Sequence, residues 1–344
     1  MQLSHLALAI ANFTFLVLLG VTALGVDEAV EEARPLEEAK VEENELVGVA
    51  RQDENFGRAT WRDYVALTKP RVISLLLFTT VLAMFVAHHG APPLWLILCV
   101  CIGGYAAAGA ANTFNMVAER DLDNAMERTS HRPTVTNKVS KRSALQFAWA
   151  LSVGSFALLW LSANFLSATL ALCGLLCYVF VYTLWLKRRT WHNIVIGGAA
   201  GAFPPLVGYA AVTGGLSPMA WFLFALVFLW TPVHFWALAI LIKDDYAKAG
   251  VPMLPVVKGD RVTVNQIGLY TILTSLVCVL PFFQSGAGPI YLVGSTALNL
   301  GLIVQTARLW RTVDRPHAKA LFKYSMVYLA LFFIVVALDQ ARYV

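Results

Sequence analysis

Residues 72–118 read VISLLLFTTVLAMFVAHHGAPPLWLILCVCIGGYAAAGAANTFNMVA and contain no Asp, Glu, Lys or Arg. This run is about twice as long as the roughly 20 apolar residues that a helix needs to cross a membrane. It is interrupted near its middle by His-His-Gly-Ala-Pro-Pro at residues 88–93, a composition that ends helices. The run therefore predicts a hairpin of two membrane-spanning helices.

Three more runs without charged residues follow, at residues 143–186, 190–242 and 262–307. The four runs are 44 to 53 residues long, and the later three also have a polar or Gly/Pro break, at residues 162–164, 213–218 and 284–289. A last apolar stretch extends from about Leu321 to Leu338. Four hairpins and this stretch predict nine spans.

The composition points to the same fold class. Hydrophobic residues make up 58% of the chain and charged residues only 14%, against roughly 25% in soluble domains. The excess apolar surface must face lipid, so we expect an all-α integral membrane protein. A formal net charge of +5 is too diluted to indicate nucleic-acid binding. All five cysteines lie inside apolar runs and are interpreted as buried thiols.

The cations predict the orientation of these spans. Lys and Arg residues occupy the loops between hairpins, whereas the hairpin tips carry none. If the segment before Lys69 is cytoplasmic, only Arg342 of the 26 Lys and Arg residues lies on the far side. By the positive-inside rule, the loops between hairpins face the cytoplasm.

The N-terminal region divides into two predicted parts. Residues 1–26 are apolar and uncharged and lack the basic start of a cleaved signal peptide, which predicts an accessory transmembrane helix with its N-terminus outside. Residues 27–60 form an acidic cytoplasmic linker, with eleven Asp or Glu between residues 27 and 54. Residues 61–344 are then the nine-helix domain.

The densest polar group lies where the second predicted helix reaches the cytoplasm. At about 100° per residue, Asn112, Asn115, Glu119 and Asp123 fall within one arc of roughly 80°, while Asp121 points nearly opposite. One face thus offers oxygen ligands one turn apart beside many cations. Hard oxygen ligands next to a diphosphate are typical of a Mg²⁺ site.

Two further groups lie where the sixth and fourth predicted helices leave the membrane. The first is Lys243-Asp244-Asp245-Tyr246, with His234 eleven residues before Asp245 on the same helical face. The second is a set of four side chains that share one face, namely Tyr178, Tyr182, Trp185 and Arg189.

Each group also has a purely structural interpretation. Carboxylates among cations in a cytoplasmic loop often form only a solvated ion-pair network. His234 alone is equally well explained as a hydrogen-bonded histidine of the helix bundle, and the aromatic face as an interfacial belt. The presence of two acidic groups at matching depth favours the functional interpretation.

The pattern Asn115-x-x-x-Glu119-x-x-x-Asp123 resembles the first acidic motif of the intramembrane UbiA-type prenyltransferases, which have nine helices. The resemblance covers about residues 60–340. Five segments narrow it to the branch that farnesylates haem: Leu67–Ser74 (LTKPRVIS), Met126–Pro133, Tyr182–Asn193, Thr231–Ala239 (TPVHFWALA) and Asp245–Val257 (DYAKAGVPMLPVV).

The resemblance implies transfer of the farnesyl group of farnesyl diphosphate to a vinyl group of haem b, with water addition, in a bacterial inner membrane. Haem b is then a substrate, and Mg²⁺ is the implied cofactor. The implied metal ligands are Asn115, Glu119, Asp123 and Asp245, with Lys243 as a further catalytic residue. The implied diphosphate-binding residues are Arg128, Arg132, Lys187 and Arg188. The implied haem or prenyl contacts are His234, Trp236, Tyr178, Tyr182 and Tyr246.

The chain departs from the superfamily pattern at two places. Glu119 stands where Asp is usual, so a carboxylate remains but is one methylene longer. The second motif is usually DxxxD, yet Lys248 and Ala249 follow four residues after Asp244 and Asp245. This loss puts a second Mg²⁺ site in doubt and suggests that Lys243 or Lys248 neutralises diphosphate directly.

Two alternatives stay open on the sequence. One is a related prenyltransferase that acts on a quinone-precursor or chlorophyll-type acceptor. The other is a secondary transporter, although transporters tend to place ionisable residues near the membrane midplane, and the spans here have no charged residue in their interiors. The resemblance to the branch that farnesylates haem also allows a haem A synthase or an oxidase-assembly protein as a partner.

Overall fold

The computed structural model describes residues 59–284 and 287–341, and all regular structure within them is helical. The predicted N-terminal helix (1–26) and nearly all of the linker (27–60) lie outside these residues. The helices are α3 (Trp61–Thr68), α4 (Pro70–His88), α5 (Leu94–Ala118), α6 (Arg120–Ala125), η1 (Glu127–Thr129), α7 (Lys141–Ser162), α8 (Phe165–Leu176), η2 (Cys177–Leu186), α9 (Asn193–Thr213), α10 (Pro218–Leu241), α11 (Lys243–Lys248), α12 (Leu254–Val277), α13 (Leu280–Gln284), α14 (Pro289–Arg311) and α15 (Arg315–Gln340).

Within the described residues, nine helical segments are long and apolar enough to span a membrane, which confirms the predicted number. The hairpin breaks lie where the Gly, Pro and polar residues predict them. Asn164 caps α8 by accepting a hydrogen bond from the Ser167 amide, and Ser217 caps α10 in the same way. Gly214 ends α9 in the left-handed region at φ 69°. The chain is therefore a multi-pass membrane protein.

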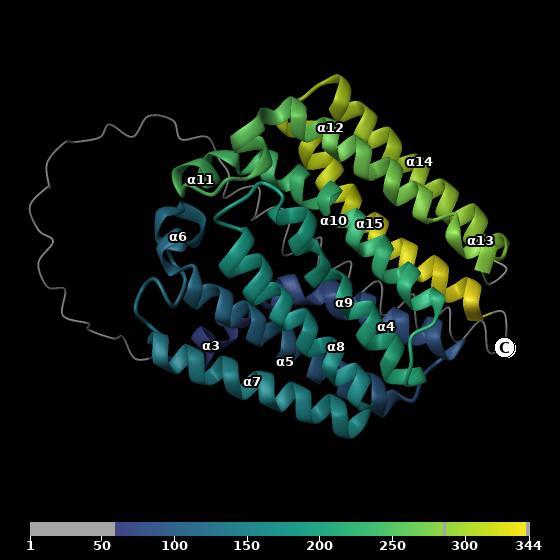
Figure 1. Ribbon diagram of the computed structural model, residues 1–344, viewed down its shortest axis with the longest axis horizontal. Coiled ribbons are helices and arrows are strands. Elements are labelled where there is room, and N and C mark those ends of the chain that lie inside the picture. The colour runs from purple at the N-terminus through teal and green to yellow at the C-terminus, as the bar shows by residue number, and fades with distance from the viewer. Residues whose placement is uncertain (1–58, 285–286, 342–344) are drawn as a thin grey trace, which may run out of the picture.

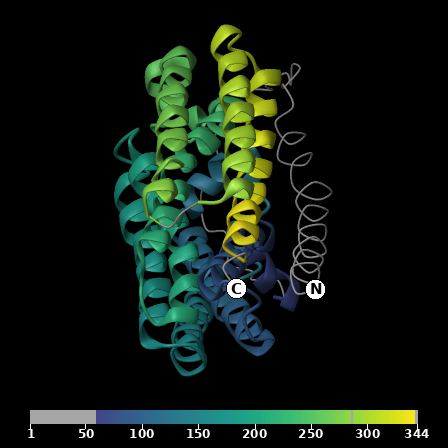
Figure 2. The same cartoon turned by 90° about the vertical axis from the view of Figure 1, so that its right-hand side faces the viewer.

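The spans run along the length of the molecule, with an inner and an outer set (Figures 1 and 2). The most hydrophobic window of α4, α9, α10 or α15 is 56–61% buried, whereas that of each other span is at most 33% buried. Small residues allow close contact at the centre. A Cβ on Gly208 of α9 would overlap the Thr80 carbonyl oxygen of α4, so the two backbones touch.

The short helices mark one end of the bundle. Helices α3, α6 and α11 gather at the left-hand end in Figure 1, whereas α13 and the last turns of α15 lie at the opposite end. Three regular helices are interrupted at this left-hand end: α5 stops before Glu119, α10 stops before Ile242, and α12 is kinked at Gly259. We call it the charged end, because it contains the loops rich in Lys and Arg.

Candidate functional site

The junction between α5 and α6 positions the first acidic motif. Glu119 has φ −106° and ψ 16°, so the helix is interrupted there. The amides of Glu119 and Asp123 still bond to the carbonyls of Asn115 and Glu119, at 2.9 and 2.8 Å. This keeps the one-turn spacing that the sequence predicts. Asn115, Glu119 and Asp123 are each only 2% exposed, whereas the side chain of Asp121 is 63% exposed.

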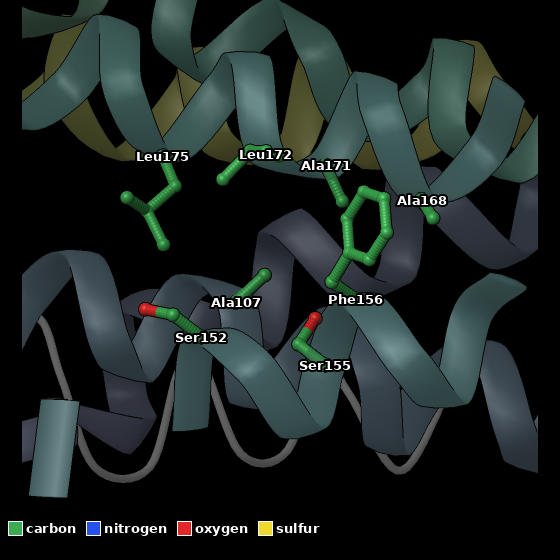
Figure 3. A pocket seen from close by; sticks show the side chains of 8 residues that line it. All are labelled: Ala107, Ser152, Ser155, Phe156, Ala168, Ala171, Leu172 and Leu175. Carbon is green, nitrogen blue, oxygen red and sulfur yellow. The ribbon is translucent and has the colours of Figure 1, made fainter. Parts of the chain in front are cut away.

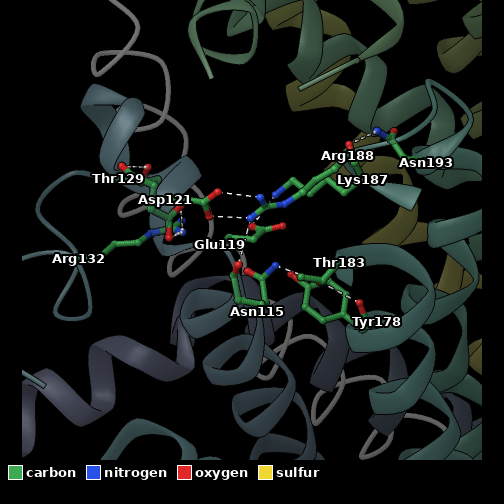
Figure 4. A network of polar contacts seen from close by, with 12 residues as sticks. Asn115, Glu119, Asp121, Thr129, Arg132, Tyr178, Thr183, Lys187, Arg188 and Asn193 are labelled. Carbon is green, nitrogen blue, oxygen red and sulfur yellow. Dashed lines mark hydrogen bonds and ion pairs between the residues drawn. The ribbon is translucent and has the colours of Figure 1, made fainter. Parts of the chain in front are cut away.

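A different cation contacts each of the three buried side chains. Lys187 Nζ lies 2.6 Å from Glu119 Oε2. Arg132 Nη1 lies 2.6 Å from both carboxylate oxygens of Asp123. Figure 4 shows that Arg132 and Lys187 approach the motif from opposite sides. The third cation, Lys69, donates to Asn115 Oδ1 at 2.8 Å.

Lys69 is the site residue that the sequence reasoning missed. It joins α3 to α4 in the left-handed conformation at φ 54°, directly before Pro70. The carbonyl of the preceding Thr68 accepts a hydrogen bond from Asn112 Nδ2 at 2.8 Å. Thr68 and Lys69 therefore bond to two residues of α5, Asn112 and Asn115, that are about one helical turn apart. Burial, and next the positive charge of Arg132, lower the pKa of Lys69 to about 7. The available signal was a lysine directly before the proline that begins a span.

Lys187 follows η2, which is a π-helix with i to i−5 hydrogen bonding. Its amide bonds to the Tyr182 carbonyl at 2.9 Å. Burial by itself would lower the pKa of Lys187, but the charge of Glu119 leads a set of opposing interactions that hold this pKa above its ordinary value. Lys187 therefore stays protonated beside Glu119. A long π-helical segment is rare, and π-bulges are frequent at functional sites.

The aromatic residues of η2 lie next to the acidic motif. Tyr178 and Tyr182 are stacked with ring centroids 5.5 Å apart. Asn115 Nδ2 donates to Thr183 Oγ1 at 3.1 Å, and Thr183 Oγ1 donates to the Tyr178 carbonyl at 2.9 Å. Gly197 of α9 makes room for Tyr182, because a Cβ there would overlap its ring.

The four side chains predicted to share one face of the fourth helix do not point in a common direction. The prediction assumed 3.6 residues per turn, and the wider π-helical turn changes the direction of each side chain. Trp185 is 55% exposed and Arg189 is also exposed, whereas Tyr178 and Tyr182 face the interior. Only the two tyrosines of the predicted face therefore lie at the site.

The other two predicted diphosphate-binding residues, Arg128 and Arg188, have surroundings that differ from those of Arg132 and Lys187. Arg128 has a buried Nε atom that finds no hydrogen-bond partner in the part of the chain that the structure describes. Arg188 pairs with Asp121 at 2.6 Å, with side chains 41% and 63% exposed. The hydrogen bond from Arg188 lowers the pKa of Asp121. Arg188 thus forms a surface pair outside the buried motif (Figure 4).

The second acidic group lies on α11. Lys243 Nζ donates to Asp260 Oδ2 at 2.7 Å, and Asp260 Oδ1 is buried without a partner among the described residues. Tyr246 of α11 and Tyr182 of η2 pack against the same hydrophobic cluster, which also contains Leu122 of α6. Within the described part of the chain, Asp245 forms no side-chain hydrogen bond or ion pair, and no three His, Cys, Asp or Glu side chains form a metal-binding group.

His234 and Trp236 are both buried in α10. His234 Nδ1 lies 2.8 Å from Ser325 Oγ of α15. Trp236 is fully buried, and its ring contacts that of Tyr270 edge-on with centroids 5.5 Å apart. Its Nε1 has no hydrogen-bond partner among the residues that the structure describes. The predicted common face of His234 and Asp245 assumed one continuous helix. The chain instead breaks at Ile242, between α10 and α11.

A small recess lies between α5, α7 and α8 (Figure 3). Its walls include Ala107, Ser152 and Phe156, and none of the predicted site residues lines it. Ala107 lies eight residues before Asn115 on α5, about 12 Å along the helix. The recess is therefore separate from the acidic motif.

Comparison with known proteins places this geometry in a family. Residues 76–333 match the UbiA prenyltransferase family. A protoheme IX farnesyltransferase of Thermus thermophilus is 55% identical over 99% of this chain, and the chain spans about half (54%) of that relative's length. A protoheme IX farnesyltransferase of Deinococcus radiodurans is 52% identical over 82% of this chain and 94% of its own length.

The fold also matches a solved structure. A UbiA homologue from Archaeoglobus fulgidus, bound to DMAPP and Mg²⁺, aligns with a TM-score of 0.62 at 18% identity. The alignment covers 80% of this chain and 99% of that protein. The nine-span bundle, the acidic motif at its charged end and the match over residues 76–333 lead to one conclusion: this chain belongs to the UbiA prenyltransferase family.

Proposed function

We propose that this protein transfers the farnesyl group of farnesyl diphosphate to a vinyl group of haem b, with addition of water, to give haem O and diphosphate. The two relatives described above, which are 52–55% identical to this chain, carry the name protoheme IX farnesyltransferase. The DMAPP and Mg²⁺ bound to the Archaeoglobus homologue support an isoprenyl diphosphate substrate and a metal ion.

The single observation that carries this proposal is the buried charge cluster of Lys69, Glu119, Asp123, Arg132 and Lys187. Ionisable groups at the edge of a membrane are costly and are usually retained for function. Three cations face two carboxylates here, and the buried Nε of Arg128 has no partner within residues 59–284 and 287–341. A cluster with this excess of positive charge suits a polyanion such as diphosphate.

The same residues fit Mg²⁺. Among the described residues, Glu119 Oε1 is buried without a hydrogen-bond partner, so one carboxylate oxygen is available for a cation. Asn115, Glu119 and Asp123 provide the oxygen atoms that Mg²⁺ prefers, and we propose Asp245 as a fourth ligand. When bound, Mg²⁺ would supply charge stabilisation for the diphosphate leaving group.

The protein residues have distinct roles in the proposed reaction. Lys69, Arg132 and Lys187 exchange their present partners for phosphate oxygens, with Arg128, Arg188 and Lys243 as further phosphate contacts. The bond between farnesyl C1 and the phosphate oxygen breaks, and its electron pair leaves with diphosphate. The faces of Tyr178 and Tyr182 stabilise the allylic cation beside them.

The acceptor completes the reaction. The π-electron pair of the haem vinyl group forms the new carbon–carbon bond, which leaves a cation on the carbon next to the porphyrin ring. Water adds to this cation and loses a proton, so that a hydroxyethylfarnesyl group results. We propose His234, Trp236 and Tyr246 as contacts of the haem or the prenyl chain, because all three lie on α10 and α11, the helices that lead to the charged end.

The proposed location is the bacterial inner membrane, with the charged end in the cytoplasm. The Lys and Arg residues of the described part lie in the loops at that end or in the helix segments that flank these loops, which supports this orientation by the positive-inside rule. Farnesyl diphosphate would then keep its diphosphate at the cytoplasmic mouth and its chain in the bilayer.

The test is a purified-protein assay with haem b, farnesyl diphosphate and Mg²⁺, in which mass spectrometry detects haem O. A parallel panel replaces haem b with quinone precursors and chlorophyll-type acceptors. Haem O formation that requires both Mg²⁺ and farnesyl diphosphate supports the proposal. Prenylation of another acceptor in preference to haem b would refute the assignment of the acceptor.

A further inference from the structure

The imidazole of His234 is fixed from three sides. Trp230 stacks on one face with ring centroids 4.6 Å apart, and Phe322 stacks on the other at 4.7 Å. Nδ1 lies 2.8 Å from Ser325 Oγ. The Ser325 carbonyl also accepts from Trp230 Nε1 at 2.9 Å. Ser325 of α15 therefore holds two rings of α10 that are one helical turn apart.

The hydrogen bonds of Ser325 determine where the imidazole proton lies. Ser325 Oγ donates to the Phe322 carbonyl at 2.8 Å, and a hydroxyl group has only one proton to donate. With this proton directed at the Phe322 carbonyl, Ser325 Oγ accepts a hydrogen bond from His234 Nδ1. In this tautomer Nδ1 carries the ring proton, and Nε2 of the neutral imidazole holds the free electron pair.

Packing by itself does not account for this arrangement. In the described part of the chain, Nε2 of His234 makes no hydrogen bond, and stacking between two aromatic rings requires no ring nitrogen. Phenylalanine would fill the same space between Trp230 and Phe322. His234 keeps 9% of its surface accessible. Because its faces and Nδ1 are covered, this accessible part lies at the edge that carries Nε2.

We propose that Ser325 is a positioning residue that fixes His234 with a free Nε2 electron pair, and that this nitrogen binds the iron of the haem acceptor. A histidine that ligates a metal typically donates its other N–H to an oxygen, which sets the tautomer and raises the basicity of the ligand. His234 lies seven residues before the end of α10, about 10 Å from the charged end. This inference rests on the proposed function, because haem is its substrate.

The experiment uses the purified full chain with haem b and without farnesyl diphosphate. Resonance Raman spectroscopy of the ferrous form detects the iron–histidine stretching band, and absorption titration measures haem affinity. His234→Phe keeps the stack but removes both nitrogens, and Ser325→Ala removes only the acceptor for Nδ1. Ser295→Ala is the matched control, because Ser295 is also buried and bonds the carbonyl three residues before it.

We expect an iron–histidine band in the wild type and in Ser295→Ala, and none in His234→Phe. In Ser325→Ala the band should shift to lower frequency, because the ligand becomes less basic, and haem affinity should fall about 10- to 100-fold. A wild type without the band overturns the inference, as does a Ser325→Ala protein that matches Ser295→Ala. If His234→Phe does not fold, Ser325→Ala alone decides the question.

The same preparations separate this inference from the proposed function. Addition of farnesyl diphosphate and Mg²⁺ to the wild type measures haem O by mass. A protein that makes haem O but lacks the iron–histidine band contradicts the inference and leaves the function intact. A protein that shows the band but makes no haem O contradicts the proposed function and leaves the ligation by His234 standing.

Discussion

Replacing Lys187 by Met should strongly destabilise the protein, because the buried carboxylate of Glu119 would lose the cation that contacts its Oε2. The two charges are 2.6 Å apart, with side chains 11% and 3% exposed. At an effective dielectric constant of about 20, Coulomb's law gives a gross attraction of about 6 kcal/mol. Desolvation offsets much of this, and removal of one partner from a buried pair typically costs about 3–5 kcal/mol. We expect a loss in that range.

A double-mutant cycle distinguishes this pair from simple packing. Lys187→Met with Glu119→Gln removes both charges, and replacement of a whole buried pair is often nearly neutral. The double variant should therefore recover most of the stability lost in Lys187→Met, with a coupling energy of about 2 kcal/mol or more. Haem O formation should stay lost, because both residues belong to the proposed site.

The measurement is reversible unfolding in mixed micelles titrated with sodium dodecyl sulfate, followed by tryptophan fluorescence. Arg188→Met is the matched control, because the neighbouring Arg188 forms an exposed pair with Asp121. Exposed pairs contribute at most about 1 kcal/mol. If Lys187→Met is no less stable than Arg188→Met, or if the single losses simply add in the double variant, the burial argument fails.

Three further predictions concern the same site. Lys69→Met should lower kcat/KM for farnesyl diphosphate about 10- to 150-fold, since a hydrogen bond from a charged group contributes about 1.5–3 kcal/mol. A change below threefold in steady-state assays would contradict the proposed role of Lys69. Gly197→Ala should cost about 1–3 kcal/mol through overlap with Tyr182 and reduce activity. Gly201→Ala is its control, because a Cβ there meets no atom within 4 Å, so that unfolding should be unchanged or shifted to higher detergent. Asp123→Ala should abolish haem O formation in membranes while the protein remains folded, and normal haem O levels would exclude Asp123 as a metal ligand.

The sequence alone determines the spans and the spacing of the acidic motif. Uncharged runs of 44 to 53 residues with one break each predict helical hairpins, because backbone hydrogen bonds must be satisfied inside the bilayer and continuous apolar runs favour helices over the alternating strands of a barrel. The spacing of Asn115, Glu119 and Asp123 likewise places them on successive turns of one face. Both inferences use only neighbours within a single segment, where hydropathy and helical periodicity are sufficient.

Only the tertiary structure decides which cation meets which oxygen. Lys69 is 46 residues from Asn115, Lys187 is 68 residues from Glu119, and His234 is 91 residues from Ser325. Such pairs depend on how spans pack against each other, and lipid-facing hydropathy carries no information about that packing. The π-helical turn of η2 is likewise visible only in the structure. The regular helical periodicity assumed from the sequence would place Trp185 on the side of the site.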